Sequence, residues 1–112
     1  MRTRDLKSAA RHMGRDAGIS AASWAEIDET NAAAILKGFE DGDPVVYDAF
    51  RFPNLSGEMA DDPTPQTLAD DLGIAEDDRR ADWLIDEICG AWEEASSLAF
   101  EREVCRRCRV YL

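Results

Sequence analysis

The chain ends in EVCRRCRVYL, where two cysteines three residues apart stand among three arginines. Such a thiol pair could form half of a zinc site or a redox couple. A structural zinc site needs four ligands, and the rest of the chain offers only Cys89 and His12. Cys89 precedes Cys105 by roughly 24 Å along the axis of a single predicted helix, so it cannot join that site.

A redox CxxC pair normally lies at the N-terminus of a helix, where the helix dipole lowers the thiol pKa. Here the pair comes at the predicted C-terminus of a helix, where arginines stabilise the last turn. We therefore predict that Cys105 and Cys108 are buried, reduced thiols, with no metal and no cofactor. A disulfide between chains is the alternative.

Carboxylates are the other abundant chemical group, since 24 acidic residues against 13 basic ones give a net charge of −11. Several acids recur along one side of a predicted long C-terminal helix, where residues four apart are separated by about 6 Å. That spacing is close to the distance between neighbouring phosphates on one nucleic-acid strand. The predicted partner-binding residues are Asp82, Trp83, Asp86, Glu87, Glu93, Glu94 and Glu101.

This carboxylate row has two interpretations. It can be a DNA-mimic surface that binds a host protein with a basic or nucleic-acid-binding surface, or it can be a solvated helix face. Acids near the helix start, such as Asp61, Asp62 and Asp77, would extend the negative surface. Trp83 can be an exposed anchor of the kind found at interface hot spots, or it can pack against the loop around Phe52.

Charge and motifs restrict the classes of function. Residues 16–103 hold 23 of the 24 acids, whereas the basic residues gather at the two ends of the chain. An acidic body repels phosphate, which argues against nucleic acid as a direct ligand. The sequence contains no GxSxG, HExxH or P-loop motif, so we expect no enzymatic activity. It contains no apolar run of membrane-spanning length and no signal peptide, which favours a cytoplasmic protein without a membrane partner.

The elements that must position these residues are predicted to be helices, giving an all-α single domain over residues 1–112. Helices are expected over 5–26, 30–41, 44–50 and 64–73, with an irregular loop near 51–64 and a long amphipathic helix from about 77 to the end. Asp43-Pro44 and Thr64-Pro65 pair an N-cap with proline at the first helical position. An alternative breaks the first helix at Gly18 and restarts it at Ser23.

Small side chains recur every four residues in the first predicted helix, at Ala10, Gly14, Gly18 and Ala22. Each glycine weakens a helix by roughly 1 kcal/mol relative to alanine, so we expect another helix to pack closely on this stripe. In the long helix, the inward stripe is predicted to hold Leu84, Ile88, Ala91, Trp92, Ala95, Leu98, Ala99, Cys105 and Cys108.

The segments ILKGFEDGDP and LSGEMADDPTPQTLADDLGI, followed by a long acidic helix, resemble a group of small acidic proteins encoded by actinobacterial phages and mobile elements. The resemblance covers about residues 21–112 and rests on turn and cap motifs, so it identifies no catalytic residue. It implies a cytosolic accessory protein, and small acidic proteins of such origin are often inhibitors of one host protein.

Three functions follow as hypotheses. The favoured one is a non-enzymatic acidic module that binds a basic host protein. The alternative is a self-associating homodimer that uses the small-residue stripe or the thiol-bearing face. A helix-turn-helix regulator is the least favoured, with residues 64–74 as its first helix and the long helix as its second. Asp77, Asp78 and Asp82 at the start of that second helix would meet the phosphates of DNA.

Overall fold

The computed structural model describes residues 2–57 and 63–112, and these residues contain five α-helices and no strand. The all-α prediction is confirmed. The helices are α1 (Thr3–Ala22), α2 (Ala32–Asp41), α3 (Pro44–Asp48), α4 (Pro65–Asp71) and α5 (Ala81–Arg109).

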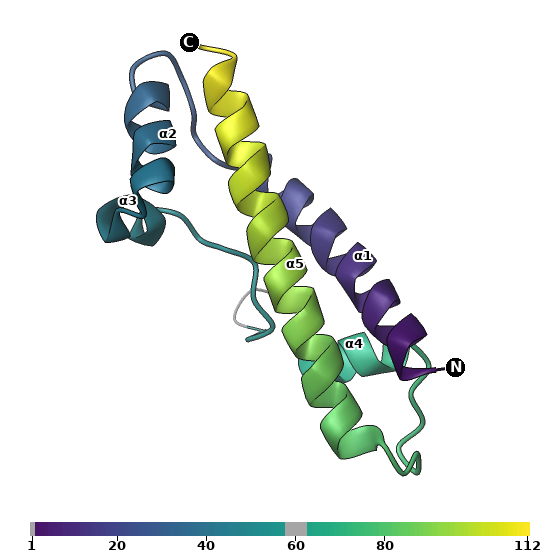
Figure 1. The fold of residues 1–112 in the computed structure, drawn as a ribbon. Coiled ribbons are helices and arrows are strands. Elements are labelled where there is room, and N and C mark those ends of the chain that lie inside the picture. The colour runs from purple at the N-terminus through teal and green to yellow at the C-terminus, as the bar shows by residue number, and fades with distance from the viewer. Residues whose placement is uncertain (1, 58–62) are drawn as a thin grey trace.

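Helix α5 runs most of the length of the molecule, and the shorter helix α1 lies beside it in the same direction (Figure 1). At one end the Arg80 side chain donates a hydrogen bond to Thr3 Oγ1 at 3.4 Å, and at the other Arg107 donates to the Ala22 carbonyl. Parallel helices need a long connection, because the chain must travel back from the end of the first helix to the start of the second. Helices α2, α3 and α4 lie in this connection. The molecule is elongated, with extents of 53 × 26 × 21 Å.

The contact between α1 and α5 is made by the predicted small-residue stripe. A Cβ atom added at Gly14 would collide with the Trp92 carbonyl, and one added at Gly18 would collide with the Ser96 carbonyl and lie 2.9 Å from the Phe100 nitrogen. The two helix backbones therefore approach to a distance that only glycine permits. The prediction of a tight helix crossing at this stripe is confirmed.

Two clusters of buried side chains contribute to the core. The first joins Leu6 of α1 to α4 and the first half of α5, and it includes Trp92, which is 2% exposed. The second joins Ala22 to α2 and the last turns of α5 and includes Phe39, and the rings of Phe50 and Phe52 pack against it. Gly14 and Gly18 thus lie along α1 between the clusters.

The predicted caps of the short helices are present. The Asp43 side chain accepts a hydrogen bond from Val45 N at 3.0 Å, and Thr64 forms a capping box with Thr67. Gly42 and Gly73 follow α2 and α4 with φ of 68° and 72°, a backbone conformation that glycine adopts without strain.

The irregular segment between α3 and α4 packs on the body at two predicted points. Leu55 is buried in the first cluster, and the Phe52 ring lies 4.6 Å from that of Phe100 between centroids. The remaining predicted anchor, Met59, lies outside the described residues.

Two predicted helix boundaries are wrong. Helix α1 ends at Ala22, four residues before the predicted end at 26. It continues through Gly18, and the Ser23 hydroxyl donates to the Ser20 carbonyl at 2.5 Å, so the alternative of a second helix that starts at Ser23 is also wrong. Helix α5 begins at Ala81 rather than near 77. The Asp78 side chain accepts from Arg80 N at 2.8 Å and holds the preceding residues in a turn.

The predicted inward stripe of α5 is correct from Leu84 to Trp92 and again at Cys105 and Cys108, and it is wrong between them. Leu98 is 47% exposed and Ala95 and Ala99 are half-buried, whereas Ser96, Phe100 and Val104 are buried. The buried residues recur every four positions from Leu84 to Cys108. In a helix of 3.6 residues per turn such a row advances by about 40° at each step, so it winds around α5 and brings successive partners into contact.

The glycine contact can be tested by paired substitutions. We expect Gly18→Ala to destabilise the protein by about 1–3 kcal/mol, because the added methyl group meets backbone atoms of α5. Gly90→Ala is the matched control, since Gly90 lies within α5 with open space around its Cβ position, and it should stabilise by up to about 1 kcal/mol. Urea unfolding would measure both, and equal stability of the two variants would contradict the close approach.

Candidate functional site

Five predicted site residues form an exposed surface on the first half of α5. This surface, here called the acidic ridge, consists of Asp82, Trp83, Asp86, Glu93 and Glu94, and all five side chains are exposed. Within the described part of the chain, none of the four carboxylates forms an ion pair or a hydrogen bond through its side chain. They are therefore available to a partner.

Two predicted site residues are engaged elsewhere in the fold. Glu87 Oε2 accepts a hydrogen bond and forms an ion pair with Lys7 Nζ of α1 at 2.9 Å. Glu101 is half-buried and accepts from the Tyr47 hydroxyl at 2.8 Å, which raises the pKa of Tyr47. Both partners are distant in sequence. Glu101 contributes to the attachment of α3 to α5, and we exclude both residues from the ridge.

The predicted extension of negative charge beyond the start of α5 is only partly free. Asp78 forms an ion pair with Arg80 at 3.0 Å, and Asp70 accepts from Gln66 at 2.8 Å. Asp77 is exposed, whereas Asp61 and Asp62 lie outside the described residues. Asp71 and Glu76 are also exposed and form no ion pair among the described residues, so unpaired carboxylates continue from the ridge past the start of α5.

The three tryptophans differ in environment. Trp92 is buried, as predicted, whereas Trp83 is 49% exposed on the ridge and Trp24 is 85% exposed after α1. Phe52 packs with Phe39, Tyr47 and Phe100, and no ring contact joins it to Trp83 within the described residues. Trp83 thus places a large apolar side chain among four unpaired carboxylates, an arrangement typical of an interface anchor.

Cys89 lies at the edge of the ridge and responds to its charge. Partial burial raises the pKa of this thiol, and the neighbouring carboxylates of Glu93 and Asp86 raise it further. Asp86 lies three positions before Cys89 and Glu93 four positions after it, so the three residues lie on neighbouring turns of one side of the helix. Two of the four ridge carboxylates thus lie close enough to Cys89 to raise the pKa of its thiol.

Cys105 and Cys108 are free and buried, as predicted. Burial is the main cause that raises the pKa of both thiols, which favours their protonated form. Of the described residues, no three histidine, cysteine or acidic side chains gather in a group that could hold a metal ion. Arg106 pairs with Glu103, and Arg107 caps the last turn of α1 rather than that of its own helix.

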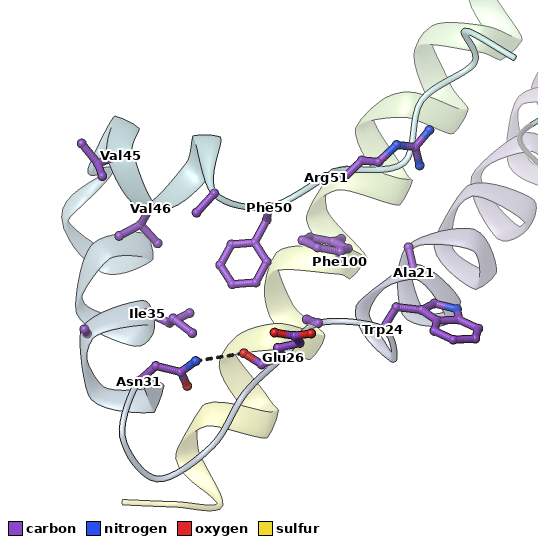
Figure 2. A pocket seen from close by; sticks show the side chains of 13 residues that line it. Ala21, Trp24, Glu26, Asn31, Ile35, Val45, Val46, Phe50, Arg51 and Phe100 are labelled. Carbon is purple, nitrogen blue, oxygen red and sulfur yellow. Dashed lines mark hydrogen bonds between the residues drawn. The ribbon is translucent and has the colours of Figure 1, made fainter. Parts of the chain in front are cut away.

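An apolar hollow that the sequence analysis missed opens between α2, α3 and the segment after α1. Figure 2 shows the Phe50 ring inside it, with Ile35 and Val46 on one side and Phe100 on the other. At the rim of the hollow, Asn31 Nδ2 donates to the Glu26 carbonyl at 2.9 Å and connects the start of α2 with the segment after α1. The indole of Trp24 points outward beyond this rim (Figure 2).

Comparisons of the chain with protein-family models, with curated protein sequences and with solved structures gave no match. None of the described helices combines the length and the apolar composition needed to span a membrane.

The effect of the ridge on Cys89 can be measured by alkylation with neutral iodoacetamide. Because nearby negative charge raises the thiol pKa, Asp86→Asn with Glu93→Gln should lower that pKa and speed alkylation of Cys89 at pH 8. Cys105 and Cys108 should stay protected until urea unfolds the protein. Peptide mapping by mass spectrometry would follow each site. An alkylation rate at Cys89 that the double substitution leaves unchanged would contradict the effect of these two carboxylates on the thiol.

Proposed function

We propose that this chain is a non-enzymatic protein-binding module whose acidic ridge binds a partner with a basic surface. The observation that carries the proposal is the position of exposed Trp83 among four carboxylates that have no described ion-pair partner. A solvated helix face does not need a large exposed aromatic residue. A binding surface does, because buried aromatic anchors supply much of the affinity at protein interfaces.

The spacing of the carboxylates favours a partner that itself binds nucleic acid. Asp82 and Asp86 are four residues apart on a helix, a separation of about 6 Å along its axis, and Glu93 and Glu94 continue the surface two turns later. Carboxylates held at that pitch on a rigid helix can take the positions of phosphates and pair with the cationic side chains of a phosphate-binding groove. The net charge of −11 would also accelerate association with a basic protein at low salt.

The resemblance to proteins of actinobacterial phages and mobile elements supports a narrower version of the proposal. In that setting the partner is a host enzyme or regulator of nucleic acid, and the chain is its cytoplasmic inhibitor. The ridge then competes with DNA for one surface of the host protein.

A homodimer is the second candidate, and the fold limits how it can form. The small-residue stripe of α1 is covered by α5 of the same chain, and Cys105 and Cys108 are buried in the second cluster. The two faces first considered for self-association are thus used within one molecule. A dimer would have to use another surface, such as the apolar hollow beside α2 and α3.

The ridge is tested by neutralising its charge in a capture experiment. We expect the variant Asp82→Asn, Asp86→Asn, Glu93→Gln and Glu94→Gln to lose at least tenfold in affinity for a basic protein retained by the wild type from an actinobacterial host lysate. The fold should be intact by circular dichroism, because none of these side chains bonds within the described structure. Retention should weaken with salt.

The matched control removes four exposed acids away from the ridge, through Glu26→Gln, Glu29→Gln, Glu40→Gln and Asp48→Asn. This variant has the same net charge as the ridge variant, so it should keep binding if position matters more than total charge. A duplex oligonucleotide should displace the wild type from the retained protein. Equal retention of both variants would refute the ridge as the binding surface, and failure of DNA to compete would refute mimicry.

A further inference from the structure

A groove of opposite charge lies on the flank of the contact between α1 and α5. It encloses about 530 Å³ and is lined by Arg11 and Arg15 from α1 and by Arg102 and Arg106 from α5. In each helix the two arginines are four residues apart, so each pair lies on one side of its helix. The packing of the two parallel helices brings both pairs to one opening.

Most of this positive charge has no acidic partner. Glu103 also lines the groove, and it forms an ion pair with Arg106 at 2.5 Å. Within the described residues, Arg11, Arg15 and Arg102 form no ion pair, although the chain contains nearly twice as many acids as bases. Three free guanidinium groups at one groove of so acidic a chain indicate a surface that receives external negative charge.

The same groove exposes apolar side chains. Ile19 of α1 is 42% exposed and Leu98 of α5 is 47% exposed, and the small side chains of Ala95 and Ala99 lie beside them. A purely phosphate-binding surface has no use for exposed aliphatic side chains. An apolar strip flanked by arginines matches an amphipathic helix that has acidic residues beside its apolar face.

We propose that this basic groove binds an acidic amphipathic helix of a partner protein. The apolar face of the bound helix packs on Ile19 and Leu98, and its carboxylates pair with Arg11, Arg15 and Arg102. Nucleic acid fits less well, because its phosphate backbone offers no apolar face to the exposed side chains of Ile19 and Leu98. The inference is independent of the acidic ridge.

The test uses two designed helical peptides of about 18 residues, or five turns, each with leucine on one face and a fluorescent label. One carries glutamate on its polar face and the other carries lysine. Fluorescence polarisation at physiological salt should show binding of the glutamate peptide to the wild-type chain. Arg15→Glu with Arg102→Glu should weaken this binding at least tenfold, because the groove then repels the peptide.

Two control variants separate the groove from net charge and from the ridge. Arg79→Glu with Arg109→Glu changes net charge equally at exposed arginines outside the groove, and it should bind the glutamate peptide like the wild type. The lysine peptide is expected to bind the wild type at the acidic ridge. The ridge-neutralised variant should lose the lysine peptide and keep the glutamate peptide, which would show that the ridge and the groove bind their partners separately.

Three results would overturn the proposal. The first is equal binding of the glutamate peptide to the wild type and to the groove variant, or no binding to either. The second is tighter binding of a single-stranded oligonucleotide than of the peptide, with loss in the groove variant, which would assign the groove to phosphate. The third is a dimer in sedimentation experiments that the groove variant abolishes, which would assign the groove to a second copy.

Discussion

The close approach of α1 and α5 at Gly14 and Gly18 is the contact on which the rest of the structure depends. Each glycine weakens α1 by roughly 1 kcal/mol as an isolated helix, so α1 depends on this packing for its stability. The contact aligns the two helices in the same direction. The chain between them must therefore return along the molecule, and this return supplies the pieces that complete both core clusters, from Ile27 and Phe39 at one end to Leu68 at the other.

The geometry of that contact also determines which surfaces of α5 stay open. Its buried row recurs every four residues and winds around the helix, so the exposed side changes along its length. In the first half, the open side carries Asp82, Asp86 and Glu93. In the second half, Leu98 and Arg102 become exposed beside α1, and the ridge and the groove are thus consequences of one packing arrangement.

Local chemistry in the sequence predicted much of this fold, and tertiary contacts account for the rest. Caps such as Asp43-Pro44 and the glycine stripe act within a few residues, which is why they could be recognised. A straight inward stripe predicts a buried Leu98, but the buried row winds around α5, so Phe100 is buried and Leu98 is exposed. Of the predicted site residues, Glu87 pairs with Lys7 and Glu101 accepts a hydrogen bond from Tyr47. These partners are 80 and 54 residues away in the sequence, so no local pattern reveals them.

The ridge and the groove have opposite charge on one helix, and screening explains how both can function. Their centres on α5 are separated by about 13 residues, or roughly 20 Å along the axis. The Debye length at physiological ionic strength is about 8 Å, so a partner at either surface meets mainly the charge of that surface. At ionic strength near 0.01 M the length grows to about 30 Å and the excess of acid extends over the groove. An acidic helix should therefore bind the groove better at physiological salt than at very low salt, which is the reverse of the dependence expected for a basic partner at the ridge.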